Sequence, residues 1–530
     1  MVSSRVTKNF RQISRLFTAE SLTQKAYMNA LAATLDYAAR LITGFIVTPF
    51  LVAGMGDTFY GVWRTLGNLT GYISAASGRP SQALKWTIAN LQSSTDYVEK
   101  RRQVSSALIV WLLFLPLLTL LGVGLVWFVP FWIKALPVQS FPIVRVAAAL
   151  LAADMIVTTL TVIPQSILEG ENLGYKRMGL SATLVFVGGG LAMLALYLNT
   201  GLVGVSVAEL TTTILTGIFF FSVMRSYIPW FGLAKPSRAA VRHFFGLSGW
   251  FLIWRLVMQL MTASDLVILG MFASADAVTQ YSLTKYAPET LINFVAIVLL
   301  GITPGLGGII GRGDIQKAAR VRGEIMLLTW LVTTIIGSTI LLWNRAFIGL
   351  WVGSGRYAGA QPNFWILVLI IQFVLIRNDA NIIDLTLNLS RKTLLGLLST
   401  GLSVGIAALL VGFYHVGIMG LIFGLMAGRA ILSLVYPTII GRFLKVSLYT
   451  QIRASIRPMV VTILLFLGAA WLDRFLNASA PFVVTWISLF GLVVVTVGGM
   501  TLLAFGLGLS GEQQRLLFQR LRMIVANAAR

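Results

Sequence analysis

Thirteen charged residues lie inside long apolar stretches of the chain, and their chemistry bears on what the protein can bind. The chain has 530 residues, of which 57% are hydrophobic and only 11% are charged. A charged side chain that faces lipid costs about 2.5–3.5 kcal/mol on insertion scales, so most of the thirteen must face protein or a water-filled cavity. Six are cations and seven are acids: Arg40, Arg64, Arg255, Lys285, Arg377 and Arg429; Asp36, Asp154, Glu209, Asp265, Glu289, Asp379 and Asp384.

Four of the cations fall on the first two apolar stretches of each half of the chain. They are Arg40, Arg64, Arg255 and Lys285. Such a group suits a dianionic diphosphate headgroup, because a guanidinium offers a planar fork that holds two oxygens at once. These four are the predicted substrate-binding residues. A structural role stays open for Arg40, four residues after Asp36, and for Lys285, four residues before Glu289, since such pairs meet on one helix face.

The acids are candidates for ion coupling. Asp154, Asp265 and Asp379 have no opposite charge three or four residues away in their own stretch. Carboxylates of this kind inside a membrane can take up and release a proton or a sodium ion during a transport cycle. Together with Asp36 and Glu289 they form the predicted coupling set, and no other cofactor is expected.

The chain lacks the residues that several other chemistries need. It has no cysteine, which excludes disulfides and thiolate chemistry, and its two histidines, His243 and His415, are far apart in sequence. A zinc site or a histidine-based catalytic group is therefore not expected. Gly54, Gly56 and Gly61 surround Asp57, but their spacing matches no phosphate-binding motif and no lysine follows. We interpret this stretch as a turn.

Fourteen apolar runs of about 20 residues predict an all-α polytopic membrane protein. The second run is glycine-rich and weak. The runs are 27–54, 59–78, 104–129, 146–168, 178–198, 202–224, 245–273, 280–310, 325–344, 364–388, 394–414, 417–441, 458–472 and 481–507.

The basic residues predict the orientation of these runs. The termini and even-numbered connections carry thirty Lys and Arg residues, and the odd-numbered connections carry five. By the positive-inside rule both termini are cytoplasmic. The net charge of +23 is spread over short connections, so nucleic acid is not an expected partner. The basic segment 1–26 and the tail 508–530 are expected to lie on the anionic lipid surface, or else to be disordered.

An internal repeat divides the chain into two halves. Sliding the sequence against itself gives matches at one offset, 216 residues: Gly54-Met55 with Gly270-Met271, Lys176 with Lys392, Gly189 with Gly405, Gly201 with Gly417, and Gly204 with Gly420. Six runs per repeat is an even number, so both copies start on the same side of the membrane. We expect two six-helix lobes, 27–228 and 243–444, followed by an appendage of two helices, 456–507.

Two turns carry a resemblance to a known family. The stretch "PFLVAGMGDTFYGVW", followed by a glycine-rich run and "ALKWTIA", resembles the start of polysaccharide repeat-unit flippases. The stretch "DLVILGMFASADAVTQYSLTKYAPETL" resembles the matching turn of their second lobe, with Tyr281-Ser282 in place of a Tyr-Gly pair. These flippases belong to the multidrug/oligosaccharidyl-lipid/polysaccharide exporter superfamily. The resemblance implies two six-helix lobes and transfer of an undecaprenyl-diphosphate-linked glycan across the inner membrane by alternating access, for O-antigen or exopolysaccharide assembly.

The alternatives differ in what the interior should contain. A cation-coupled multidrug exporter of the same fold would prefer a carboxylate-rich cavity, and six cations against seven acids argue moderately against it. A facilitator of the twelve-helix type would carry an acidic and Arg-rich glycine motif that "SGRPSQALKW" lacks. A glycan-processing enzyme would need a larger outer loop than 344–363 and a flanking acid pair, so no enzyme is expected. Expected partners are the lipid-linked glycan, membrane lipids, and the polymerase and glycosyltransferases of the same pathway.

Overall fold

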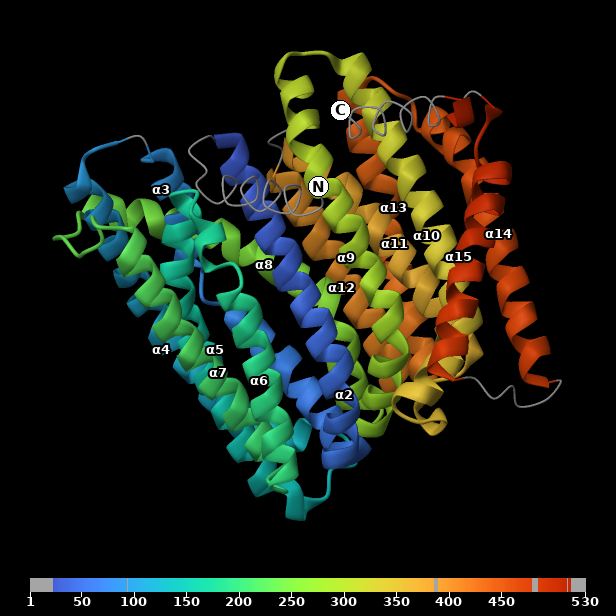
Figure 1. Cartoon of the computed structure of the whole chain (residues 1–530), viewed down its shortest axis with the longest axis horizontal. Coiled ribbons are helices and arrows are strands. Elements are labelled where there is room, and N and C mark those ends of the chain that lie inside the picture. Colours follow the sequence, from blue (N-terminus) through green and yellow to red (C-terminus); the bar gives the residue numbers. More distant parts are fainter. Residues whose placement is uncertain (1–21, 93, 386–388, 479–484, 512, 516–530) are drawn as a thin grey trace, which may run out of the picture. The chain divides into compact units, whose positions relative to one another are not determined.

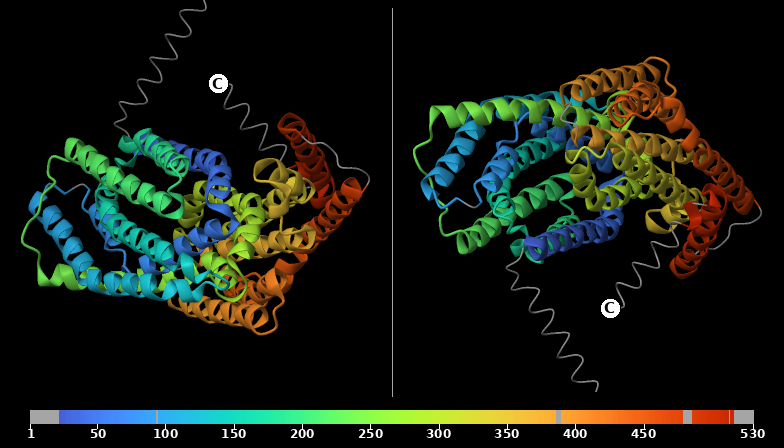
Figure 2. Two further views of the ribbon diagram at one scale, coloured as in Figure 1. Left: turned by 90° about the horizontal axis from the view of Figure 1, so that it is seen from below. Right: turned by 90° about the horizontal axis from the view of Figure 1, so that it is seen from above.

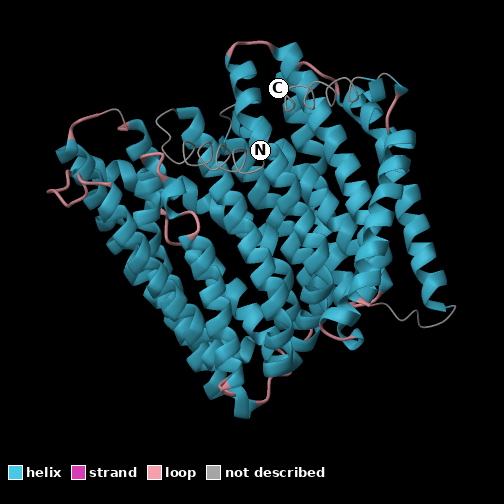
Figure 3. Ribbon diagram, viewed as in Figure 1, coloured by secondary structure: helices cyan, strands magenta, loops and turns pink. Residues whose placement is uncertain are grey.

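The computed structural model describes residues 22–92, 94–385, 389–478, 485–511 and 513–515. Within these residues the chain consists of α-helices and three short 3-10 turns, with no strand (Figure 3). Twelve of the described helices are long and apolar enough to cross a membrane. The chain is therefore a multi-pass helical membrane protein, as the apolar runs predicted. Most of the predicted terminal segments, 1–26 and 508–530, falls outside the described residues.

The chain forms two compact units, residues 1–262 and 263–530, each described here by itself. Unit 1 holds α2 (Leu22–Ala75), α3 (Pro80–Asn90), α4 (Tyr97–Trp132), η1 (Val138–Ser140), α5 (Phe141–Gly170), η2 (Gly174–Arg177), α6 (Leu180–Tyr197), α7 (Gly201–Tyr227) and most of α8 (Arg238–Phe272) (Figure 1). Unit 2 holds α9 (Ala275–Gly311), α10 (Ile315–Trp351), η3 (Ser354–Arg356), α11 (Ala360–Leu385), α12 (Leu389–Gly412), α13 (Gly417–Leu444), α14 (Leu448–Ala478) and α15 (Trp486–Gly508). The predicted lobe boundary, between 228 and 243, covers the connection after α7 and the first turn of α8.

The first two predicted runs share α2, which bends at the predicted glycine turn. A straight helix of 54 residues would be about 80 Å long, far more than the hydrocarbon core of about 30 Å. Gly56 interrupts the helix with φ 74° and ψ 167°, a conformation that favours glycine. Beside it, a side chain at Gly54 would meet Leu196 of α6 at 2.9 Å. These contacts explain the two glycines as a bend and a close packing point.

The helix bounds repeat at the offset found in the sequence. Gly201 begins α7 and Gly417 begins α13, and both have positive φ, 54° and 64°. Two residues earlier, Asn199 and His415 have φ 55° and 53°. The same offset carries η1 onto η3. A repeated left-handed turn at equivalent positions requires the same backbone geometry before each sixth helix, which accounts for the matched glycines.

Helix packing is similar in the two units. In unit 1, α5 packs along α7, α6 contacts α2 and α7, and α4 contacts α5, as seen side by side from two directions in Figure 2. In unit 2, α11 and α12 both pack on α13. The two extra helices, α14 and α15, pack on α10. Polar contacts join them to it, since Thr334 and Thr462 lie 2.6 Å apart and Trp343 donates to Thr496.

The α12–α13 contact depends on Gly424 and Gly428, which lie four residues apart on α13. A Cβ atom at Gly424 would lie 2.4 Å from the backbone of Ala407, whereas one at Gly405 of α12 would enter open space. We expect Gly424→Ala to lower thermal stability by about 1–3 kcal/mol through overpacking of backbone against backbone. The matched control Gly405→Ala should leave stability unchanged or slightly raised. Thermal unfolding in detergent measures both. Equal stability of the two variants would contradict this packing.

The orientation of the helices can be tested by labelling, because the chain has no cysteine of its own. Ala239→Cys lies at the exposed start of α8, on the predicted cytoplasmic side, and Ser354→Cys lies in exposed η3, on the predicted outer side. A membrane-impermeant thiol reagent added to intact cells should label only the second variant. Labelling of the first variant alone would mean that the topology is inverted.

Candidate functional site

Two arginines of unit 1 interact electrostatically with each other, and neither has an ion-pair partner among the described residues. Arg79 follows α2 and is the N-cap residue of α3, and Arg255 lies on α8. Both are half-buried. Burial and the charge of Arg255 lower the pKa of Arg79 to about 10, so Arg79 stays charged at neutral pH. Neither forms an ion pair with any carboxylate that the structure describes. A half-buried pair of like charges without a counter-ion is suited to binding an anion.

The backbone at Arg79 is unusual for a residue with a side chain. Arg79 has φ 45° and ψ 55°, in the left-handed region, and follows Gly78, whose φ is 64°. A non-glycine residue in this region costs roughly 1–3 kcal/mol and persists only where its surroundings hold it there. In the sequence, Arg79 lies in the connection between the apolar runs 59–78 and 104–129. The glycine before it was a signal of the turn, but nothing in the sequence showed that the turn brings it to Arg255.

The predicted substrate-binding residues fall into different surroundings. Arg40 is exposed on α2, and Arg255 lies beside Arg79 as described. Arg64 is half-buried among acids of α5 and α7. The 216-residue offset carries Arg40 to Leu256, next to Arg255, but it carries Arg64 to Gln280, five residues from Lys285. The repeat therefore relates Arg40 closely to Arg255, but it does not relate Arg64 closely to Lys285.

Lys285 is held by acids in the interior of unit 2. Its Nζ atom lies 2.7 Å from Asp265 of α8 and 3.6 Å from Glu289. Asp265 also accepts hydrogen bonds from the hydroxyl of Tyr281 at 3.0 Å and from the backbone N–H of Leu266. The predicted pairing of Lys285 with Glu289 is present, but Asp265 is the closer partner. The ammonium group of Lys285 is thus engaged within the protein.

The other charged group of this cluster is Arg429. It lies on α13, is 5% exposed, and interacts electrostatically with Asp265 and Tyr281. Its guanidinium also lies over the ring of Phe373, with 5.5 Å to the centroid. Two cations and two acids balance in this part of unit 2, so the cluster leaves no net charge for an external anion.

Asp36 and Asp379 also have cationic partners that their own helices do not supply. Asp36 pairs with Arg177 of η2 at 3.3 Å and not with Arg40, the same-helix partner that the sequence left open. Asp379 of α11 accepts three hydrogen bonds from Arg322 of α10, at 2.8–3.1 Å. The coupling role predicted for these acids stays a prediction, but both carboxylates are engaged.

Arg322 and Lys100 were both counted as loop cations and are both buried. Arg322 is 7% exposed on α10, and Lys100 is 2% exposed on α4, where it pairs with Glu171 at 2.8 Å. The reason is that α4 and α10 begin well before their apolar runs. Each starts at an aspartate, Asp96 or Asp314, whose carboxylate accepts the backbone N–H three residues on. These N-cap aspartates were a readable signal in the sequence.

Asp154 is the one predicted coupling residue without a cation within 4 Å in the part of the chain that the structure describes. It lies on α5, where it interacts with Thr213 of α7, and its Oδ1 atom is buried without a hydrogen-bond partner. It interacts with Glu209 of α7, which was not in the predicted set. Both acids lie within candidate membrane spans.

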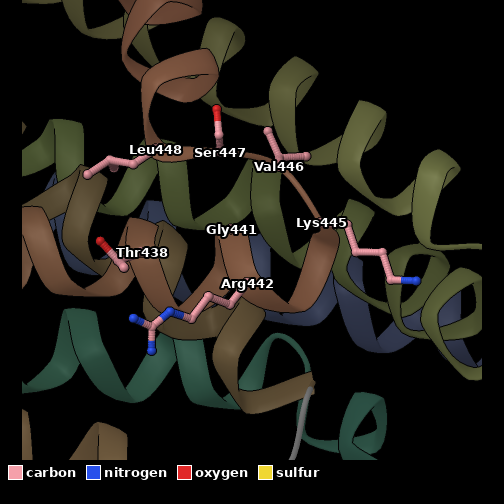
Figure 4. Close-up of a pocket in the computed structure, with 7 residues that line it drawn as sticks. All are labelled: Thr438, Gly441, Arg442, Lys445, Val446, Ser447 and Leu448. Carbon is pink, nitrogen blue, oxygen red and sulfur yellow. The ribbon is translucent and has the colours of Figure 1, made fainter.

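A hollow of about 340 Å³ lies where α13 meets α14 in unit 2. It is lined by Thr438, Gly441, Arg442, Lys445, Val446, Ser447 and Leu448. The side chains of Arg442 and Lys445 point in opposite directions (Figure 4). They do not converge on one point, so this hollow lacks the geometry of a two-pronged anion site.

Comparison with known proteins finds solved structures of similar fold. The chain matches no protein-family model and no curated protein. Among solved structures, it is similar to an inward-facing MATE-family multidrug resistance transporter of the MOP superfamily, with a TM-score of 0.62 and 14% identity over 78% of this chain and 98% of the other. It is also similar to the lipid II flippase MurJ in an inward closed conformation, with a TM-score of 0.63 and 12% identity over 90% of this chain and 98% of the other.

The chain has the fold of these transporters. At 12–14% identity the likeness concerns the fold, and it extends over nearly the full length of both solved structures. The MOP superfamily is the one that the two sequence turns resembled. The similar structures are a lipid flippase and a drug transporter. The fold therefore does not distinguish a lipid substrate from a drug substrate, and that choice depends on the chain's own residues.

Proposed function

We propose that the chain is a flippase that moves an undecaprenyl-diphosphate-linked oligosaccharide across the bacterial inner membrane by alternating access. The observation that carries this proposal is the like-charge pair of Arg79 and Arg255 in unit 1. A diphosphate supplies the two negative charges that the pair lacks, and each guanidinium can donate two parallel hydrogen bonds to its oxygens. The likeness to the lipid II flippase MurJ supports the proposal by analogy of fold.

The place of the pair in the chain fits the loading step of such a flippase. Arg79 follows the second predicted run, in a connection predicted to be cytoplasmic, and the glycan of such a substrate is assembled on that side. A cation pair that is half-buried interacts with an anion more strongly than a fully solvated pair does, because water screens it less. The glycosyltransferases and polymerase of surface polysaccharide assembly are then its expected partners.

The second candidate is a cation-coupled multidrug exporter. It is favoured by the acids Asp154 and Glu209 in unit 1 and by the likeness to a MATE-family multidrug resistance transporter. A cationic drug would, however, be repelled by Arg79 and Arg255. The two candidates therefore predict opposite preferences for the charge of the substrate.

Purified protein in liposomes distinguishes the two candidates. The probe is a fluorescent polyprenyl-diphosphate sugar, and its loss from one leaflet is followed with an impermeant quencher. We expect transfer of this lipid, no transfer of the matching polyprenyl sugar without the diphosphate, and no uptake of a cationic dye. Uptake of the dye without transfer of the diphosphate lipid would support the exporter and reject the flippase.

A further inference from the structure

Three charged side chains from three helices interact electrostatically inside unit 1. Arg64 lies on the second part of α2, Asp154 on α5 and Glu209 on α7. α5 packs along α7, and α2 contacts both. All three residues lie within candidate membrane spans, Leu31–Ala75, Val138–Gly170 and Gly201–Tyr227. Their placement brings two acids and one cation into a region that lipid surrounds.

The hydrogen bonds of this group are incomplete. The polar side chains nearest to the acids are Trp63, which interacts with Glu209, and Thr213, which interacts with Asp154. Glu209 interacts electrostatically with both Asp154 and Arg64. The Oδ1 atom of Asp154 and the Nε atom of Arg64 are buried without a hydrogen-bond partner. One acceptor and one donor thus remain unsatisfied in the same group, which buried polar atoms in folded proteins usually avoid.

Other charged residues on the neighbouring elements are engaged elsewhere. α6 contains no charged residue. On α4, Lys100 pairs with Glu171, Arg102 with Glu99, and Arg101 donates to the carbonyl of Trp230.

The remaining elements near the group are similar in this respect. Arg177 of η2 pairs with Asp36 and Glu169, and Lys176 lies over the rings of Tyr175 and Tyr227. On α3, Lys85 pairs with Glu169, and Arg255 of α8 lies beside Arg79. None of these groups forms an ion pair with Arg64, Asp154 or Glu209.

Charge balance in this group requires one more positive charge. With both acids ionised, two negative charges would face one positive charge in a medium that solvates ions poorly. A single proton on either carboxyl restores neutrality. A metal ion fits the residues less well, since no cluster of three ligating His, Cys, Asp or Glu side chains occurs in the described chain, and Arg64 already repels cations.

We propose that Asp154 and Glu209 form a proton-binding site that holds one proton at neutral pH, with Arg64 as the counter-ion of the remaining carboxylate. The proton resides on the pair, and either carboxyl can carry it. The site belongs to unit 1 alone and does not depend on which substrate the chain transports. It adds Glu209, which has no charged partner on its own helix, to the acids that the sequence singled out.

Infrared spectroscopy of the purified wild-type protein tests the proposal directly. A protonated carboxyl group has a C=O stretching band that ionised carboxylates lack and that shifts in D₂O. Titration to high pH should remove the intensity of one such group, because the proton of the pair then dissociates. Only ionised carboxylates, which lack this band, then remain beside Arg64. This measurement needs no variant. A spectrum in which no protonated carboxyl is present at neutral pH would overturn the proposal.

Variants assign the band to the pair. Glu209→Gln and Asp154→Asn should each remove it, because the acid that remains can ionise beside Arg64. Arg64→Gln should double it, because both carboxyls then lack a counter-ion. Asp36→Asn is the matched control: Asp36 pairs with Arg177, so the band should not change. Persistence of the full band in both single acid variants would assign the proton elsewhere and reject the site.

Discussion

Arg79→Glu should stop the transfer of a diphosphate-linked lipid and at the same time leave the folded protein slightly more stable. The wild-type pair places two guanidinium groups together, so a glutamate at residue 79 converts repulsion with Arg255 into attraction. For a half-buried pair this adds up to about 1 kcal/mol to the free energy of unfolding. The same glutamate repels a diphosphate and should cost about 2–5 kcal/mol of binding, or more than tenfold in affinity.

The opposite signs of the two effects separate binding from folding. A variant that loses activity because it misfolds would show a lower melting temperature, whereas Arg79→Glu should show an equal or higher one. Arg79→Lys should keep the charge, lose the planar fork, and give an intermediate transfer rate. Lys235→Glu, an exposed cation of another predicted cytoplasmic connection, is the matched control and should transfer lipid normally. Wild-type transfer by Arg79→Glu would remove Arg79 from the site.

The apolar pattern predicted the helices and their repeat because burial in lipid constrains the whole length of a span. Runs of about 20 apolar residues have few other folds available in a membrane, since every backbone group must be satisfied within the segment. The glycines at 56, 201 and 417 were equally readable, because a positive φ leaves few alternatives to glycine. These features are local, and local features can be read from one sequence.

The ends of the helices were less predictable from apolarity. α4 and α10 extend into polar sequence, and the buried cations Lys100 and Arg322 lie in those extensions. An amphipathic extension has too few apolar residues to pass a test for membrane spans. The N-cap aspartates Asp96 and Asp314 mark the true starts, and they would have placed both cations on helices.

The partners that charged residues find on other helices could not be predicted. The four-residue spacing on one helix predicts pairs such as Lys285 with Glu289. The closer partner of Lys285 is Asp265, which lies on another helix. The same holds for Arg79, whose neighbour Arg255 is far away in sequence. Which side chains meet across helices depends on helix rotation and tilt, which packing sets and which a single sequence does not display.

Asp379→Asn should strongly destabilise the fold of unit 2. Asp379 is 2% exposed and Arg322 is 7% exposed, and the carboxylate accepts three hydrogen bonds from the guanidinium. Neutralising Asp379 leaves a buried guanidinium without its counter-charge, which typically costs about 3–5 kcal/mol. Thermal and denaturant unfolding in detergent measure the loss. Glu289→Gln is the control, because this side chain is 41% exposed and its removal should cost less than about 1 kcal/mol.

The double variant Arg322→Met with Asp379→Leu distinguishes structure from ion coupling. Replacing both members of a buried ion pair by apolar residues is often neutral, so the double variant should recover most of the stability that Asp379→Asn loses. If the pair only holds α10 against α11, the double variant should also transfer substrate at the wild-type rate and respond to an ion gradient as the wild type does. A stable double variant that no longer responds to the gradient would instead establish the coupling role that the sequence predicted for Asp379.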